Sequence, residues 1–248
     1  MLSKSNIKYI NSLKAKKFRQ KYHKFIAEGD KIVKEMLENP QISFEKIFCT
    51  EKWAATQADL LRAHSPKVRF VTDNELNKIS SLQTPNQVLV IAEQLNNSVE
   101  ATKIENGLSL VLETMQDPGN MGTILRIADW FGIEQVFCSK DCVDIYNSKV
   151  VQASMGAFLR VNVQYLDLEE LFKRHSTLPV YGAMLGGDNI FEMELAQKGF
   201  IVIGNEGRGI SDKIANLLTH KIEIPKYGGA ESLNAAVATG IICSIFKK

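Results

Sequence analysis

The sequence has few of the residues that build metal centres or disulfide frameworks. Only four cysteines and four histidines occur among 248 residues, and neither a zinc-finger spacing nor a His-Glu-x-x-His motif is present. Cys138 and Cys142 are close in the sequence, but no histidine lies near them. Cys138 ends an apolar strand pattern, which favours a small buried thiol over a metal ligand. We therefore expect a protein without a metal site.

Long apolar segments are also missing. No run approaches the roughly 20 apolar residues that span a bilayer, and the N-terminus lacks the apolar core of a signal peptide. The hydrophobic share of 45% and the charged share of 23% are ordinary for a globular protein. The sequence thus predicts a cytoplasmic globular protein, long enough for one large or two ordinary domains.

Charge is nearly balanced over the whole chain but uneven along it. The formal net charge is only +2, yet eight basic residues precede the first acidic residue, Glu28. They are Lys4, Lys8, Lys14, Lys16, Lys17, Arg19, Lys21 and Lys24. A basic segment in a near-neutral protein suits contact with a polyanion such as nucleic acid. A solvated helix face is the alternative, and the segment taken alone favours it.

Residues 1–94 are predicted to form a small α/β domain. Phe18, Tyr22 and Phe25 have helical spacing and are more typical of core positions than of a base-stacking surface. Further helices are expected at about 28–37 and 53–63, and strands at 42–49, 68–71 and 88–92. The chain then becomes polar, so residues 95–107 are predicted to be a linker.

From residue 108 onward, short apolar segments alternate with helix patterns. Strands are expected at 108–112, 135–138, 161–165, 180–184, 200–204 and 221–224. Helices are expected at 123–131, 148–157, 168–175, 212–218 and 233–246. This alternation predicts an α/β domain over 108–248 with a mostly parallel sheet and helices on both faces.

Three polar, glycine-bearing turns each follow a predicted strand of this domain. The first contains Asn120 and, six residues later, Arg126. If a helix begins near Met121, both side chains could face one ligand, and an arginine there could bind an RNA phosphate with its planar donor fork. Equally, Asn120 could be a helix cap and Arg126 a surface residue.

The second turn runs from Gly204 to Ser211 and has three glycines in six residues. It is not a P-loop, because no Gly-Lys-Ser/Thr follows, and its glycine spacing does not fit a dinucleotide fingerprint. Glu206 could orient a ligand or the loop itself. The alternative is a tight turn in which Ser211 caps the next helix.

The third turn runs from Ile224 to Asn234. Ser232 or Glu231 is expected to begin the last helix, with Ser232 as a simple cap. A serine nucleophile is less plausible, since none of the four histidines lies in a recognisable triad motif.

In this order, the three turns resemble the signature motifs of the SpoU/TrmH family, in the SPOUT class of RNA 2′-O-ribose methyltransferases. They read Asn-x-Gly-x-x-x-Arg-x-Ala at residues 120–128, Gly-Asn-Glu-Gly-x-Gly-Ile at 204–210 and Ile-Pro-x-x-Gly-x-x-Glu-Ser-Leu-Asn at 224–234. Residues 25–29 and 81–86 more weakly resemble the family's substrate-binding domain, which is similar to RNA-binding ribosomal proteins.

The resemblance implies that S-adenosylmethionine donates a methyl group to a ribose 2′-hydroxyl of RNA, with ribosomal RNA favoured and transfer RNA, or RNA binding without catalysis, as alternatives. It implies a deep trefoil knot and a homodimer. The implied catalytic residues are Asn120, Arg126, Glu206, Ser232 and Asn234. The implied cofactor-binding residues are Met184, Gly204, Glu206, Gly209, Ile224 and Leu233. With RNA as partner, the basic segment becomes an RNA-binding candidate through Lys14, Lys16, Lys17, Arg19 and Lys21.

Two features of the resemblance affect what these residues are expected to do. A guanidinium stays protonated in proteins, so we expect Arg126 to hold a phosphate and the reacting hydroxyl rather than to act as a base. Lys226-Tyr227 stands where relatives often carry an apolar residue, and Ala235-Ala236 replaces a bulkier pair. These departures concern the choice of target rather than the chemistry.

Overall fold

The computed structural model describes residues 2–96 and 101–248. The chain divides into two compact units, which are described separately. Unit 1 comprises Met1–Asn96 and Asp144–Gly156, and unit 2 comprises Asn97–Val143 and Ala157–Lys248. The segment Asp144–Gly156 was expected in the C-terminal domain, but it packs with the N-terminal residues. None of the described helices is long and apolar enough to cross a membrane.

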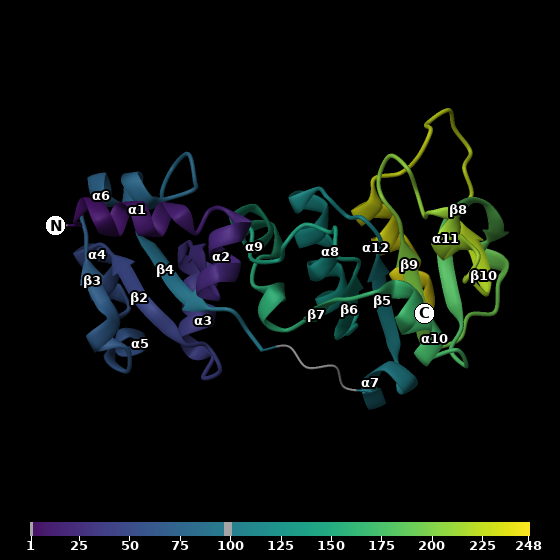
Figure 1. The fold of residues 1–248 in the computed structure, drawn as a ribbon, viewed down its shortest axis with the longest axis horizontal. Helices are drawn as coiled ribbons and strands as arrows, with labels where there is room; N and C mark the ends of the chain where they lie inside the picture. Colours follow the sequence, from purple (N-terminus) through teal and green to yellow (C-terminus); the bar gives the residue numbers. More distant parts are fainter. Residues whose placement is uncertain (1, 97–100) are drawn as a thin grey trace. The chain divides into compact units, whose positions relative to one another are not determined.

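Unit 1 is built on a mixed sheet of four described strands in the order β1-β4-β2-β3. The strands are β1 (Lys24–Glu28), β2 (Phe44–Cys49), β3 (Val68–Phe70) and β4 (Val88–Glu93). Among these strands the β2–β3 pairing is parallel, and the β1–β4 and β2–β4 pairings are antiparallel. The helices are α1 (Lys4–Ser12), α2 (Lys16–Tyr22), α3 (Asp30–Glu38), α4 (Glu51–Thr56), α5 (Ala58–Arg62), α6 (Asp73–Ile79) and α9 (Ser148–Ser154) (Figure 1).

The predicted helix through Phe18, Tyr22 and Phe25 is wrong at its end. Helix α2 stops at Tyr22, because His23 adopts the left-handed conformation with φ 53° and the chain then enters β1. Phe25 is fully buried in that strand and packs its ring against Tyr146. Three aromatic residues at helical spacing could not reveal a strand that is buried along most of its length.

Arg19 is a correction to the predicted RNA-binding set. Its side chain is buried, with the residue only 2% exposed. Its Nε donates to Asp144 Oδ2 at 2.8 Å, and its Nη1 donates to the carbonyl oxygens of Leu13 and Lys14. A guanidinium enclosed in this way ties the turn between α1 and α2 to the segment 144–156 and is not available to an RNA phosphate.

Unit 2 contains a parallel sheet of six described strands in the order β10-β8-β9-β5-β6-β7 (Figure 1). The predicted α/β class and parallel sheet are therefore confirmed. The strands are β5 (Leu108–Leu112), β6 (Gln135–Cys138), β7 (Asn162–Tyr165), β8 (Val180–Asn189), β9 (Gly199–Ile203) and β10 (His220–Glu223). The helices are α7 (Ala101–Asn106), α8 (Pro118–Trp130), α10 (Leu168–Arg174), α11 (Asp212–Ala215) and α12 (Ala235–Phe246).

Helices cover both faces of this sheet, as the run of buried apolar strand residues predicts. On one face, Val180 and Phe200 pack with Leu171 of α10 and Ile214 of α11 in a single apolar cluster. Tyr181, which follows Val180 and points to the opposite face, packs its ring against Phe246 of α12. Helix α12 in turn packs closely on α8.

The predicted linker, residues 95–107, is not entirely irregular. Residues 97–100 lie outside the described residues, and α7 occupies Ala101–Asn106. Its Ile104 is fully buried in the apolar cluster of unit 2. A polar composition concealed this short helix, because a single inward-facing isoleucine gives no periodic pattern.

Replacing Arg19 with alanine should destabilise unit 1 by about 3 kcal/mol, because Asp144 and two carbonyl groups lose a buried partner. The unfolding of unit 1 can be followed in urea by the fluorescence of Trp53, which is buried there. Lys17→Ala, an exposed change on the same helix, is the control and should alter stability by less than about 0.5 kcal/mol. Equal effects of the two changes would contradict a structural role for Arg19.

Candidate functional site

The three glycine-bearing turns lie at one edge of the parallel sheet of unit 2. They follow β5, β9 and β10, whose carboxyl ends point in the same direction. This edge is where ligands bind in open α/β sheets. The expectation that the turns belong to one site therefore has a geometric basis.

One asparagine side chain joins the three turns. Asn234 Nδ2 donates a hydrogen bond to Asn120 Oδ1 at 2.8 Å, and Asn120 Nδ2 donates to Glu206 Oε1 at 2.9 Å. The Asn120 amide thus uses its acceptor toward one turn and its donor toward another. Side chains 86 and 114 residues apart are brought together in this way.

Helix α8 begins earlier than the sequence suggested. Its N-cap is Asp117, whose Oδ1 accepts from the Asn120 backbone N–H at 2.7 Å, and Pro118 occupies the first turn. Asn120 therefore lies inside the first turn and is not the cap. Its side chain is free of capping and available for the bonds to Glu206 and Asn234.

Helix α12 begins later than predicted. Its N-cap is Asn234, whose Oδ1 accepts from the backbone N–H groups of Ala236 and Val237. Ser232 and Glu231 lie in the exposed loop before it, so the prediction that one of them begins the helix is wrong. Among the described residues, the Ser232 hydroxyl makes no hydrogen bond with Asn120, Glu206 or Asn234.

The second turn folds back on itself as a small hairpin. Asn205 and Gly209 exchange backbone hydrogen bonds at 3.0 and 2.9 Å, and Asn205 Oδ1 accepts from the N–H groups of Gly207 and Arg208. Gly209 has φ 69°, which glycine adopts without strain. Gly204 has no room for a side chain: a Cβ there would lie 2.3 Å from the Gly209 carbonyl carbon.

The end of the central strand β5 holds this hairpin on both sides. Asn205 Nδ2 donates to the Thr114 carbonyl oxygen at 2.9 Å, and the Ser211 backbone N–H donates to the Glu113 carboxylate at 2.9 Å. Ser211 also caps α11 through Ile214 N–H, as the alternative interpretation of this turn had it. Asn205 and Ser211 lie on either side of Glu206 in the sequence. Their bonds to the end of β5 therefore fix the position of Glu206.

Thr114 is the site residue that the sequence least revealed. It has φ 54°, which is unusual for a β-branched residue and costs conformational energy. Its N–H donates to Ser139 Oγ and its hydroxyl to Asp141 Oδ2, both at 2.8 Å. The hydrogen bond from Ser139, assisted by that from Thr114, lowers the pKa of Asp141 below its ordinary value. No sequence pattern marks a threonine for this conformation.

Arg126 lies on α8 with an exposed side chain. Within the part of the chain that the structure describes, its guanidinium has no hydrogen-bond or ion-pair partner. It is therefore not part of the Asn120 network, and its predicted role is not tested by the structure. Trp130, one turn further along α8, is 84% exposed.

The predicted cofactor-binding residues lie within β8, in the turn after β9, directly after β10 and in the loop before α12. Gly204 is buried, Met184 and Ile224 are half-buried, and Leu233 is exposed. The carboxylate of Glu223 accepts from the Gly186 N–H at 2.8 Å, which holds the turn in β8 against β10. A partly exposed apolar set beside glycine-rich backbone fits a flat heterocycle with polar edges.

All four cysteines are buried and free, which confirms that Cys138 is a buried thiol. A hydrogen bond from Cys138 lowers the pKa of Cys142 to about 7 and raises that of Cys138 well above its ordinary value. Cys142 Sγ also accepts from the Met115 backbone N–H at 3.2 Å. Among the described residues, no group of three metal-ligating side chains occurs.

The profile of the SpoU rRNA Methylase family matches residues 107–244, which is more than half of the chain. The chain belongs to this family. A second profile, the MRM3-like substrate binding domain, matches residues 4–90. The SpoU match covers all three turns, and the substrate-binding match covers nearly all of the predicted N-terminal domain.

Relatives and solved structures agree with this assignment. The chain is 30% identical to an uncharacterized tRNA/rRNA methyltransferase of Synechocystis sp., over 95% of this chain and 88% of that protein. It is 27% identical to the 23S rRNA (guanosine(2553)-2′-O)-methyltransferase RlmP of Bacillus subtilis, over 95% and 93%.

Among solved structures, a protein assigned to the TrmH family of RNA methyltransferases from Porphyromonas gingivalis has 37% identity and a TM-score of 0.83, covering 99% of this chain and 98% of that one. An AdoMet-bound rRNA methyltransferase from Sinorhizobium meliloti has 26% identity and a TM-score of 0.87, covering 100% and 96%.

Replacing Gly204 with alanine should disrupt the hairpin of this SpoU-family site, because the new Cβ meets backbone that cannot rotate away. We expect a loss of about 1–3 kcal/mol of stability and faster hydrogen exchange at the Asn205 and Gly209 amides. Gly228→Ala is the matched control, since a Cβ there meets no atom within 4 Å. Exchange at wild-type rates in Gly204→Ala would mean that the hairpin has another shape.

Proposed function

We propose that this protein transfers a methyl group from S-adenosylmethionine to a ribose 2′-hydroxyl of RNA, most favourably ribosomal RNA. The observation that carries the proposal is the hydrogen-bond network Asn234–Asn120–Glu206, which links all three family turns at the ligand-binding edge of the sheet. The rRNA methyltransferases of Bacillus subtilis and Sinorhizobium meliloti support the choice of reaction and substrate.

S-adenosylmethionine, when bound, supplies an electrophilic methyl group. We assign its binding to Met184, Gly204, Glu206, Gly209, Ile224 and Leu233. Met184, Ile224 and Leu233 would enclose the apolar parts of the cofactor, and the hairpin around Gly204 and Gly209 would offer backbone groups to its polar edges. The AdoMet-bound relative supports the assignment.

The protein's own part in the reaction is to position the ribose and to stabilise charge. Arg126 has no ion-pair partner among the described residues, and its guanidinium can hold an RNA phosphate and lower the cost of a developing alkoxide. Asn120 and Asn234 fix the Glu206 carboxylate in one orientation. We assign Ser232 to the substrate as well, because its loop is exposed beside this network.

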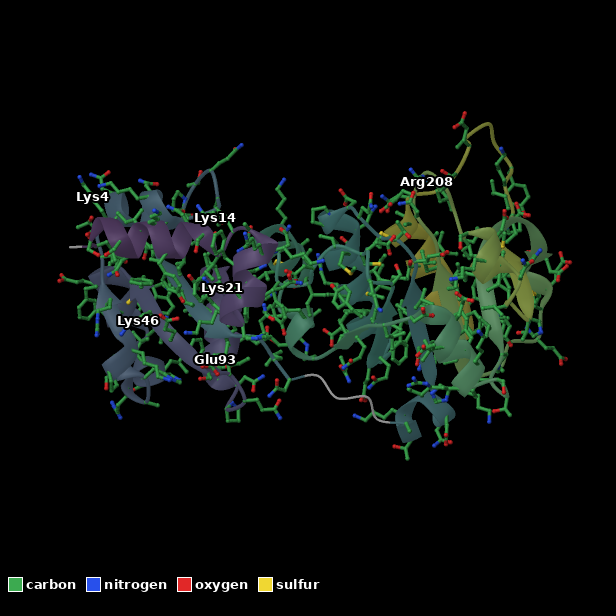
Figure 2. The ribbon with its side chains drawn as sticks, in the orientation of Figure 1. Lys4, Lys14, Lys21, Lys46, Glu93 and Arg208 are labelled. Atoms are coloured by element: carbon green, nitrogen blue, oxygen red, sulfur yellow. The ribbon has the colours of Figure 1, made fainter. Side chains whose placement is uncertain are left out.

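We further propose that residues 1–94 form the RNA-binding domain, 95–107 the linker and 108–248 the methyltransferase domain, from which the segment Asp144–Gly156 joins the compact unit of the N-terminal residues. Lys14, Lys16, Lys17 and Lys21 are exposed on or beside α2 and remain the RNA-binding candidates. Figure 2 labels Lys14 and Lys21. Lys14 also donates to the Ser80 carbonyl oxygen at 2.7 Å. This contact leaves its charge at the surface.

The trefoil knot and the homodimer belong to the same proposal. Support for a dimer comes from exposed apolar side chains on α8 and α12, Trp130 at 84% and Val237 at 52%. Large apolar side chains left in water on two helices that pack on each other would be covered if this face met another subunit. Transfer RNA is the second candidate substrate, because the Synechocystis relative is described as a tRNA/rRNA methyltransferase.

The experiment for this function combines binding with product analysis. Calorimetry should show binding of S-adenosylmethionine or its demethylated product without added metal. Ribosomal RNA incubated with the protein and the labelled cofactor should yield a 2′-O-methylated nucleoside after digestion, and maps of total RNA with and without the gene should name the position. Tight binding of ATP or NAD, with neither methyl-group ligand bound, would refute the proposal.

Arg126→Ala should slow single-turnover methylation by on the order of 10² to 10³, as loss of one such electrostatic contact does. Arg126→Lys should be nearly as slow, because it keeps the charge but loses the planar fork. Stability should change by less than about 0.5 kcal/mol, since the side chain is exposed. Arg174→Ala, on α10, is the control and should react normally. Normal turnover of Arg126→Ala would remove it from the active site.

A further inference from the structure

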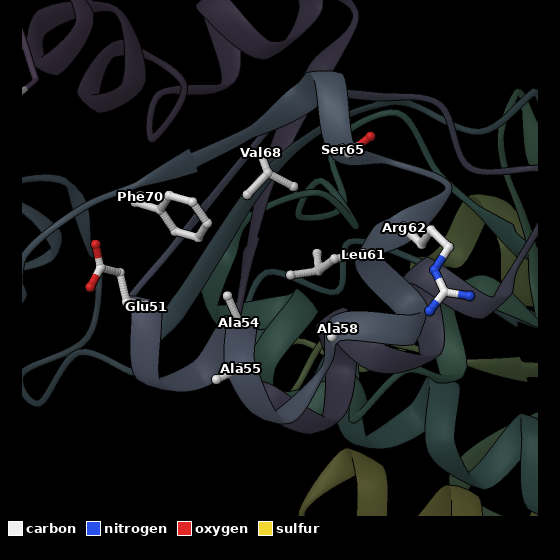
Figure 3. A pocket seen from close by; sticks show the side chains of 9 residues that line it. All are labelled: Glu51, Ala54, Ala55, Ala58, Leu61, Arg62, Ser65, Val68 and Phe70. Atoms are coloured by element: carbon white, nitrogen blue, oxygen red, sulfur yellow. The ribbon is translucent and has the colours of Figure 1, made fainter.

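A groove in unit 1 has no part in the site described so far. It has a volume of about 650 Å³ and lies between α4, α5, the 3-10 turn Ser65–Lys67 and the strand β3 (Figure 3). This volume is within the range of about 300–1,000 Å³ that small-molecule sites occupy. The groove lies within the residues matched by the substrate-binding profile, so the substrate RNA is the first occupant to consider.

The floor and one wall of the groove are apolar. Ala54, Ala55 and Ala58 of α4 and α5 line the groove with small side chains that leave it open, and Leu61 forms its floor. Val68 and Phe70 are two residues apart in β3, so their side chains lie on the same face, the one that lines the groove. Phe70 is 59% exposed, on a strand that pairs only with β2 among the described strands. An exposed ring over a shallow apolar floor is a platform for stacking a planar group.

Two polar groups stand at opposite ends of this floor. Figure 3 shows Glu51 beside Phe70 at one end and Arg62 with Ser65 at the other. Within the part of the chain that the structure describes, the Glu51 carboxylate has no hydrogen-bond or ion-pair partner. Arg62 pairs with Asp59, but both side chains are more than four-fifths exposed, so the guanidinium is open to another anion.

The segment that carries the groove has an excess of positive charge, which favours a polyanion over an apolar peptide. Of the charged residues that line it, Glu51 and Arg62 balance each other, and the rest of the segment 51–70 adds three cations, Lys52, Lys67 and Arg69, against the one carboxylate of Asp59. One carboxylate at the aromatic end is still useful to a nucleic-acid site, since Glu accepts hydrogen bonds from exocyclic amino groups of bases. Unpaired RNA bases are recognised by such a combination of aromatic stacking and edge contacts.

We propose that this groove binds one unpaired, amino-bearing nucleobase of the RNA substrate. The base stacks on Phe70, its exocyclic amino group donates to Glu51, and a neighbouring phosphate lies against Arg62. The proposal rests on the proposed function, because it makes the groove part of substrate recognition. It also predicts a preference: cytosine, with an amino group at position 4, should bind better than uracil, whose oxygen there is repelled by the carboxylate.

The test uses the full chain and fluorescently labelled hexamers of cytidine and of uridine, with affinity measured by anisotropy. Phe70→Ala should weaken cytidine-hexamer binding by about fivefold or more, the lower end of the loss for one stacked base. Phe70→Trp should restore it. Glu51→Ala should remove the preference for cytidine over uridine. Phe191→Ala, an equally exposed phenylalanine of unit 2, should bind both hexamers as the wild type does.

Ultraviolet cross-linking of the cytidine hexamer should label the peptide that carries Phe70. Unchanged binding in Phe70→Ala with no cross-link in residues 51–70 would overturn the proposal, and would leave the groove to a protein partner. A failure of this proposal can be distinguished from a failure of the proposed function. Hexamer binding through the groove without methylation of any RNA would refute the reaction alone. Methylation of ribosomal RNA by Phe70→Ala at the wild-type rate, with limiting RNA, would refute the groove alone.

Discussion

The geometry of the candidate site depends on the hydrogen bonds of one side-chain amide. Asn120 accepts from Asn234 and donates to Glu206, and an asparagine is among the few side chains that can do both at once. An aspartate of the same shape would lose the donor and place a second negative charge beside Glu206. A leucine would leave both partners without their bond. The three family turns can therefore meet in this arrangement only if position 120 carries a neutral group with both functions.

Hydrogen bonds around Thr114, at the end of β5, hold the turns that carry this amide and Glu206 in place. Thr114 takes a strained conformation there and is bound by Ser139, Asp141 and Asn205. Such strain persists only where the surroundings determine the backbone, and it is common at functional sites. The hydrogen bonds fix the start of the turn that leads to Asn120 and the start of the hairpin that carries Glu206. Both turns are thus positioned from the same residue.

Unit 1 shows how a sequence pattern can point to the right surface but to a wrong member of it. Eight basic residues precede Glu28, and most of them are exposed. Arg19 has the same charge as the lysines around it and lies among them in the sequence, yet its side chain is buried and pairs with Asp144. What separates it from Lys17 is a carboxylate 125 residues away. A pattern of neighbouring residues cannot reveal a partner so far away in the sequence.

The sequence by itself determined the alternation of strands and helices after residue 108, the parallel sheet that follows from it, and the three turns that identify the family. These features follow from local properties, namely the periodicity of apolar residues, the turn residues and the spacing between them. It misjudged where α8 and α12 begin, because Asp117 and Asn234 cap those helices and neighbouring polar residues are equally good caps on composition alone. It also missed β1, α7 and the conformation of Thr114. Only the tertiary structure decided which side chains meet, such as Asn120 with Glu206 and Arg19 with Asp144, because the free energy of a buried or shared polar contact depends on partners brought near by the whole fold.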